Sequence, residues 1–243
     1  MSAGISAGIS AGISAGISAG NSAGMKQRLV PFSPFIAVSL IHLAALLFGN
    51  DAWSSSTKLM LMPALLVSLL WLLLGVLRLG VTRLLVFASL GIVFSWAGDA
   101  LLADPEGIGF LLGLASFALA HAAYLVLFLF VLRERRVPWP VLAFAAWWVL
   151  IVIVLAPHVG ALLVPVAIYG LLIVALAAVS FSANRFVVIG AVTFLISDTL
   201  LSLKFFVPGW HFYPIDFIIM AFYLVGQGFI AYGVVHRARA LAG

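Results

Sequence analysis

The sequence predicts an all-α fold, a polytopic membrane bundle of eight transmembrane helices. Of its 243 residues, 65% are hydrophobic and 8% are charged, and the mean hydropathy is +1.30. A water-soluble domain of this composition would have too little polar surface to cover itself. The apolar runs are about twenty residues long and lack the alternation of barrel strands, so we expect helices that satisfy their own backbone hydrogen bonds in lipid.

The first 24 residues differ from the rest of the chain. A Ser-Ala-Gly-Ile repeat runs from Ser2 to about Gly20, and residues 21–24 lead to Met25, a second plausible start. The segment has no charged region ahead of a continuous apolar core, which a signal peptide would need. We therefore interpret residues 1–24 as an artificial or low-complexity leader, and residues 25–243 as a single eight-helix transmembrane domain.

Eight apolar spans follow Met25, each long enough to cross a bilayer. The connections are short and contain turn-forming residues, as at 49–53 and 208–211. This pattern indicates one compact bundle without a separate soluble domain. The expected spans are residues 30–48, 58–77, 84–103, 109–132, 138–155, 160–181, 186–207 and 214–235.

Charged residues predict how the bundle lies in the membrane. Most lysines and arginines fall on one side of an eight-span arrangement, while Asp51, Asp104, Glu106 and Asp216 fall on the other, so the positive-inside rule places both termini in the cytoplasm. The net charge of +5 therefore reflects topology signals, and no nucleic-acid partner is expected. The basic clusters are Lys26 with Arg28, Arg78 with Arg83, residues 133–136, Arg185, and Arg237 with Arg239.

Two lysines remain outside these clusters. Lys58 and Lys204 fall at the outer ends of their spans. A lysine at such a position can extend its ammonium to the lipid headgroups. The chain contains no cysteine, which excludes disulfides and thiolate chemistry.

An ionisable side chain stands inside the third span. Asp99 is the only charged residue in the stretch 91–102. An aspartate near a helix centre costs about 2.5 to 3.5 kcal/mol to insert, so such a residue is by default functional and faces a protein interior or a wet cavity. The alternative is that Asp99 bonds a neighbouring helix and only helps the helices to associate.

A second aspartate stands in a matching stretch of the seventh span. Residues 190–201 carry glycine, valine, aspartate and paired leucines at the same relative positions as residues 91–102, so that Asp198 corresponds to Asp99. Four spans separate the copies, which predicts two parallel four-helix repeats related by an axis along the membrane normal. The aspartates would then lie at similar depth in the outer part of the membrane and face one shared cavity. The same offset aligns residues 122–126 with residues 221–225.

Further polar side chains fall where they could join the aspartates. Some share a helix face because they are three or four residues apart, and others lie next to an aspartate or one turn before it. The candidates are Ser95, His121, Tyr124, Ser197, Tyr223 and Gln227.

Metal binding is the least favoured interpretation of the histidines. A lone histidine in a membrane helix is more often a hydrogen-bonded packing residue than a ligand. A zinc site would need three or four converging ligands, and only His42, His121 and the aspartates are available, without a motif such as HExxH. We predict neither a metal nor another cofactor.

Several motifs, in order, resemble those of the YhhN-like lysoplasmalogenases. The resemblance covers nearly all of the chain after Met25. The family often has a proline directly after the lysine of the first motif, where this chain has Leu59. The motifs are Lys58-Leu-Met-Leu-Met-Pro63, Gly98-Asp-Ala-Leu-Leu102, Gly113-Leu-Ala-Ser-Phe117 leading to His121-Ala-Ala-Tyr124, Ser197-Asp-Thr-Leu-Leu201 and Tyr223-Leu-Val-Gly-Gln227.

The resemblance implies an integral membrane hydrolase that cleaves the vinyl-ether bond of lysoplasmalogens, releasing a fatty aldehyde and glycerophospho-ethanolamine or glycerophosphocholine. This reaction begins with protonation of an alkene carbon, and a carboxyl in a low-dielectric site is a suitable donor because burial disfavours its charged form. An ionised carboxylate can then stabilise the oxocarbenium ion and orient water, as the carboxyl pair of glycosidases does on a related cation.

We therefore expect Asp99 and Asp198 to form the acid and base pair, and the sequence does not distinguish their roles. His121 and Tyr124 would orient one of them, and Tyr223 and Gln227 would line the water or glycerol side. Lys58 would meet the lipid phosphate. The partners implied are the lysophospholipid substrate and membrane lipids. The oligomeric state and the head-group preference stay open.

Two other functions remain open at this stage. A proton-coupled small-molecule transporter also uses membrane carboxylates, a histidine and internal repeats. A zinc-dependent membrane lipid hydrolase is the other alternative. The compactness of the chain and the lack of eukaryotic sorting signals favour the bacterial inner membrane as its location.

Overall fold

The computed structural model describes residues 30–74, 79–103 and 108–242. The leader, Lys26, Arg28, Arg78, Asp104 and Glu106 lie outside these residues. Within the described part every regular element is a helix, and there is no strand. The elements are η1 (Val30–Phe32), α2 (Ser33–Leu47), α3 (Asp51–Leu74), α4 (Leu79–Leu101), α5 (Gly109–Val126), η2 (Leu127–Val131), η3 (Trp139–Leu142), α6 (Ala143–Val159), η4 (Gly160–Leu162), α7 (Leu163–Ser180), α8 (Arg185–Phe206) and α9 (Ile215–Ala242).

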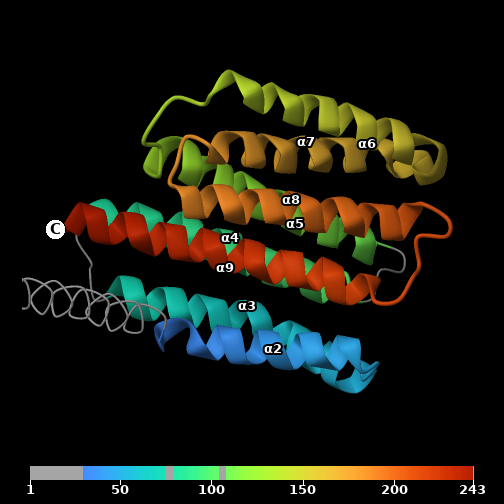
Figure 1. Ribbon diagram of the computed structural model, residues 1–243, viewed down its shortest axis with the longest axis horizontal. Coiled ribbons are helices and arrows are strands. Elements are labelled where there is room, and N and C mark those ends of the chain that lie inside the picture. The colour runs from blue at the N-terminus through green and yellow to red at the C-terminus, as the bar shows by residue number, and fades with distance from the viewer. Residues whose placement is uncertain (1–29, 75–78, 104–107, 243) are drawn as a thin grey trace, which may run out of the picture.

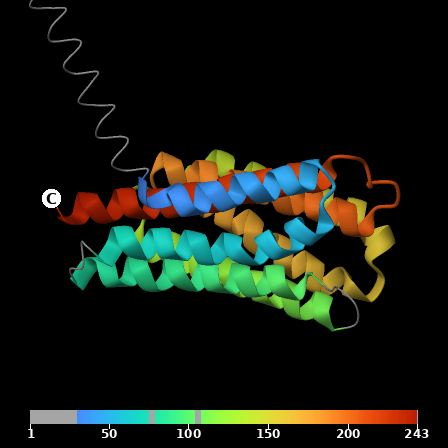
Figure 2. The same cartoon turned by 90° about the horizontal axis from the view of Figure 1, so that it is seen from below.

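Helices α2 to α9 run along one long axis (Figures 1 and 2). In Figure 1 the pair α6 and α7 lies at one side of the bundle and the pair α2 and α3 at the other, with α4, α5, α8 and α9 between them. The two predicted repeat stretches therefore lie on central helices, α4 and α8. The start of α2 and the end of α9 lie at the same end of the bundle.

The helices follow the expected apolar spans, with clear differences at α9, which continues to Ala242 beyond the expected residue 235, and at α3. This helix begins at Asp51, ahead of the expected residue 58, and includes a run of serines and a threonine. Asn50 accepts a hydrogen bond from the backbone N–H of Trp53 at 3.1 Å, which caps the free end of the helix. Hydropathy could not reveal this turn because its residues are polar.

Among residues 30–74, 79–103 and 108–242, seven helical segments are long and apolar enough to cross a membrane. The longest covers residues 139–180 and contains both α6 and α7. The chain reverses between these helices at Gly160, whose φ of +56° is a conformation that glycine adopts without strain. The number of eight spans and the cytoplasmic placement of the termini stay predictions.

Glycines allow the central helices to approach closely. A Cβ atom at Gly190 of α8 would lie 2.7 Å from the carbonyl oxygen of Gly226 in α9. At the equivalent position of the predicted repeat, a Cβ on Gly91 of α4 would overlap the ring of Tyr124 in α5. Small residues at such positions let helix backbones pack tightly in a membrane.

Candidate functional site

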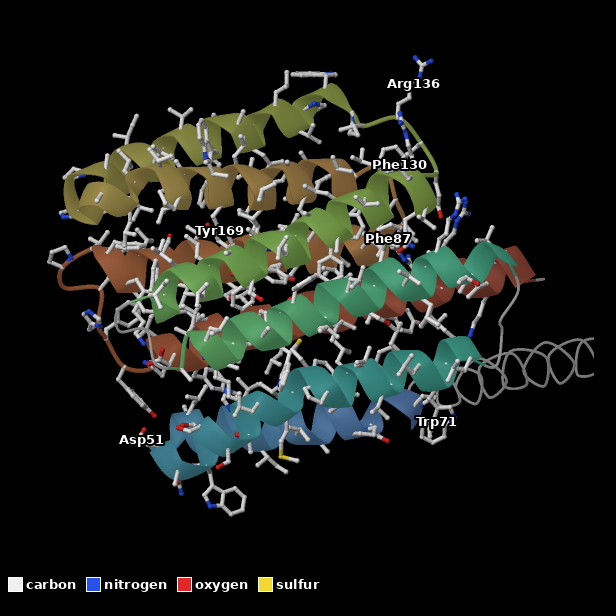
Figure 3. All side chains as sticks on the ribbon, turned by 180° about the vertical axis from the view of Figure 1, so that it is seen from behind. Asp51, Trp71, Phe87, Phe130, Arg136 and Tyr169 are labelled. Carbon is white, nitrogen blue, oxygen red and sulfur yellow. The ribbon has the colours of Figure 1, made fainter. Side chains whose placement is uncertain are left out.

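A cavity of about 450 Å³ lies among α2, α3, α4, α8 and α9, and Phe117 of α5 adds to its wall. Lining residues near its mouth belong to the end of the bundle that carries Asp51, opposite the end that carries Arg136 (Figure 3). The cavity is lined by both apolar and ionisable side chains. The ionisable ones are His42, Lys58, Asp99, Asp198, Lys204 and Asp216.

Asp99 is held by groups from two other helices. The hydroxyl of Tyr223 on α9 donates a hydrogen bond to Oδ2 of Asp99 at 2.7 Å. The ammonium of Lys58 on α3 lies 4.0 Å from Oδ1. Asp99 is 5% exposed, so a cation at this distance stabilises the carboxylate form more than it would in water.

Pro63, five residues after Lys58 in α3, frees a backbone carbonyl next to that lysine. Pro63 has no N–H, so the carbonyl of Leu59 loses its partner within the helix. The indole N–H of Trp96 on α4 donates to this carbonyl at 2.9 Å. This bond ties α3 to α4 one residue beyond Lys58, close to Asp99.

Asp198 has a different set of neighbours. The hydroxyl of Tyr169 on α7 donates a hydrogen bond to its Oδ2 atom, and the Nε2 atom of His121 on α5 lies 3.8 Å from the same oxygen. The histidine ring packs edge to face against Tyr169 and Phe194. Figure 3 shows Tyr169 midway along α7. The polar neighbours of Asp198 are thus a tyrosine and a histidine, whereas those of Asp99 are a tyrosine and a lysine.

A second polar cluster lies next to the aspartates, away from the cavity. The hydroxyl of Tyr124 donates to Oε1 of Gln227 at 2.7 Å, and Nε2 of Gln227 donates to Oγ of Ser95 at 2.9 Å. All three side chains are buried, and none is among the residues that line the cavity. This geometry differs from the expected one, because Tyr124 contacts no aspartate and Gln227 lies outside the cavity wall.

The remaining predicted residues take intermediate positions. His121 is buried beside Asp198 but does not line the cavity. Ser197 lines the cavity, and its hydroxyl donates to the carbonyl of Ile219 at 2.9 Å, which ties α8 to α9. Tyr223 both lines the cavity and binds Asp99, so it orients a carboxyl as well as forming wall.

Sequence reasoning missed Tyr169 and gave Lys204 only a role at the headgroups. Tyr169 is the only tyrosine of the expected span 160–181, a visible signal, but its contact with Asp198 depends on how α7 is rotated against α8. Lys204 lines the cavity and forms an ion pair with Asp216, which also lines it.

His42 also proves to be part of the cavity wall. The hydroxyl of Thr57 donates to the carbonyl of Trp53 at 2.5 Å, so its oxygen accepts the hydrogen bond from Nδ1 of His42 at 2.9 Å. This arrangement assigns the proton of a neutral ring to Nδ1. The Nε2 atom is buried without a hydrogen-bond partner in the described part of the chain. His42 therefore lines the cavity while its acceptor nitrogen stays buried.

The described residues provide no set of side chains arranged to coordinate a metal ion. In the described ranges 30–74, 79–103 and 108–242, no three histidine, aspartate or glutamate side chains gather closely enough to hold an ion. His42 and His121 contact different groups, Thr57 and Asp198 respectively.

Together the fold and the cavity define the class: an integral membrane protein of apolar helices with two buried carboxyls at one cavity. The model of the YhhN family matches residues 53–234, so the chain belongs to the YhhN family. Membership supports a hydrolase-like activity within the membrane. Comparison with curated proteins and with solved structures gives no match.

Proposed function

We propose that the protein is a lysoplasmalogenase, which hydrolyses the vinyl-ether bond of a lysoplasmalogen to a fatty aldehyde and glycerophospho-ethanolamine or glycerophosphocholine. The observation that carries this proposal is that Asp99 and Asp198, from corresponding positions of α4 and α8, line one cavity. Membership in the YhhN family is consistent with such a hydrolase.

Vinyl-ether hydrolysis needs an acid and a base in one site. The acid transfers a proton to the alkene carbon, and the resulting oxocarbenium ion is attacked by water. Two carboxyls in different states of protonation can divide these tasks, as they do in glycosidases. Asp99 and Asp198 have different neighbours, Lys58 in one case and Tyr169 with His121 in the other, which supports such a division.

The cavity also suits the polar part of a lysophospholipid. Lys58 and Lys204 supply positive charge at its wall for a phosphate. Asp216 already neutralises Lys204, so Lys58 is the stronger candidate for the phosphate contact. The volume of about 450 Å³ lies in the range of small-molecule sites, and it accommodates a glycerophosphate group with water.

The direct test is aldehyde release from a lysoplasmalogen by the purified protein in lipid nanodiscs. General acid and base catalysis contributes about 10²- to 10⁴-fold, so Asp99→Asn and Asp198→Asn should each lower kcat by at least about 100-fold. Asp51→Asn is the matched control, because Asp51 is exposed and does not line the cavity. This variant should keep wild-type activity.

Three results would count against the proposal. Full aldehyde release by both asparagine variants would remove the carboxyl pair from the mechanism. Substrate or proton flux across liposomes without any chemical product would instead favour the proton-coupled transporter. A third result, loss of aldehyde release on chelation and its recovery with zinc, would favour the zinc-dependent hydrolase.

A further inference from the structure

A second, apolar groove meets the cavity at Asp198. It lies between α6, α7 and α8 and holds about 50 Å³. Aromatic and aliphatic side chains form its wall, among them Trp148, Val152, Ile173 and Leu195. Asp198 is the only one of the described residues that lines both the groove and the polar cavity. The carboxyl therefore stands at a boundary between an apolar and a polar compartment.

The vinyl-ether group of the proposed substrate also joins a polar part, the glycerol, to an apolar part, the hydrocarbon chain. In a vinyl ether O–C1=C2–R, C1 is bonded to the glycerol oxygen and C2 carries the hydrocarbon chain. The proton is added to C2, on the chain side, whereas water attacks C1, on the glycerol side. The acid must therefore lie near C2, and the base that orients the water must lie near C1, at the other end of the double bond.

We propose that the first carbons of the alkenyl chain bind in the groove between α6, α7 and α8, and that Asp198 donates the proton to C2. Asp99, which lines only the polar cavity, stabilises the cation and orients the water at C1. This inference rests on the proposed function and deepens it, since it places the lipid and separates the roles of the two carboxyls.

The charges around the two carboxyls support this assignment. Asp99 has the Lys58 ammonium at 4.0 Å, which favours its ionised form. Asp198 has no lysine or arginine within ion-pair distance among the described residues, and its one basic neighbour is His121. Tyr169 donates to Oδ2 of Asp198, so a proton on Oδ1 stays available for transfer.

The groove is too small for a whole chain, and this fixes what it can hold. About 50 Å³ is less than twice the share of liquid volume of one water, so it takes only the carbons next to the double bond. The rest of the chain would extend from the groove into the bilayer. The lipid would thus react without leaving the membrane.

The proposed hydrolysis needs water as its only co-reactant, and its atoms balance as follows. The C=C electron pair forms the new C2–H bond with the Asp198 proton, and C1 becomes the oxocarbenium carbon. Water adds to C1 and returns one proton to Asp198 through Asp99 or solvent in the cavity. The hemiacetal then loses its hydroxyl proton while the C1–O bond to glycerol breaks and the glycerol oxygen takes up a proton.

The first test fills the groove and uses the neighbouring residue as its control. Val152 lines the groove, whereas Ile153 is 64% exposed on the same helix and does not line it. Val152→Trp should raise KM for long-chain lysoplasmalogens at least tenfold, with a much smaller effect on a short-chain, water-soluble vinyl ether of the same head group. Ile153→Trp should leave both substrates unaffected.

The second test separates the carboxyls by binding instead of turnover. The probe is a lysolipid with a protonated secondary amine in place of the vinyl ether, which carries positive charge where the oxocarbenium ion forms. Asp99→Asn should weaken its binding at least tenfold, and Asp198→Asn should change it less than threefold. Titration calorimetry in nanodiscs gives both values and does not depend on activity.

The outcomes of these tests distinguish a failure of this inference from a failure of the proposed function. A wild-type protein that releases no aldehyde from any chain length contradicts the proposed function. A fully active Val152→Trp variant, with unchanged dependence on chain length, overturns the groove. Stronger loss of amine binding in Asp198→Asn than in Asp99→Asn reverses the roles of the carboxyls.

Discussion

At the scale of single residues, three tyrosine hydroxyls serve two different purposes. Tyr223 and Tyr169 each donate to one aspartate, whereas Tyr124 donates to Gln227. In the proposed mechanism the first two hold the carboxyls in place. The third satisfies a buried amide oxygen that would otherwise lack a partner, so its contribution is to stability.

Phenylalanine substitutions should separate these purposes. Tyr223→Phe and Tyr169→Phe each remove the hydrogen bond that orients a carboxyl, and we expect kcat to fall about 10- to 100-fold with little change in thermal stability. Tyr124→Phe leaves Oε1 of Gln227 unsatisfied at a cost of about 1–3 kcal/mol, so the melting temperature should fall while kcat changes less. Aldehyde release and thermal unfolding in detergent measure the two effects. Equal losses of kcat in all three variants would contradict the separation.

Sequence reasoning found the site residues that stand out along the chain and missed those that depend on helix rotation. Asp99 and Asp198 are visible because a carboxylate interrupts an apolar run. Tyr169 and His42 reach the site only because α7 and α2 turn particular faces inward, and helices that are apolar all round give no sequence signal for that rotation. For the same reason Tyr124 could not be assigned to Gln227.

At the scale of whole helices, the apolar spans were predictable and their polar extensions were not. Helix α3 continues to Asp51 because Asn50 caps it. The pair α6 and α7 was predicted as two spans, 138–155 and 160–181, although a single apolar segment of 42 residues contains both helices and the turn at Gly160. Hydropathy measures how well a segment dissolves in lipid, and it does not register where the backbone reverses.

The close contact between α8 and α9 yields a prediction of its own. Gly190→Ala places a Cβ 2.7 Å from a backbone carbonyl of Gly226, which cannot move without separating the helices. We expect a loss of about 1–3 kcal/mol, the range for overpacked cores, and a lower melting temperature. Gly228→Ala is the control, because its Cβ would meet the ring of Phe35 at 3.2 Å, a side chain that can shift. Equal stability of the two variants would contradict the tight contact.

At the scale of the molecule, the absence of cysteine in the sequence makes the orientation of the bundle easy to test. Asp51 and Arg136 are exposed at opposite ends of the bundle (Figure 3). If the positive-inside rule holds, a membrane-impermeant maleimide should label an Asp51→Cys variant in intact cells and an Arg136→Cys variant only after permeabilisation. The reverse pattern would invert the predicted topology.

The hydrogen-bonded cluster of Tyr124, Gln227 and Ser95 has a consequence for the energetics of the reaction. It lies beyond the aspartates, and the neighbouring core includes Leu127, Phe128 and other fully buried apolar side chains. We therefore expect water and protons to reach the carboxyls from one compartment and to return to it, so that in the proposed hydrolysis a transmembrane voltage or pH gradient does no work on them. The proposed hydrolysis is then driven only by the concentrations of the lipid and its products.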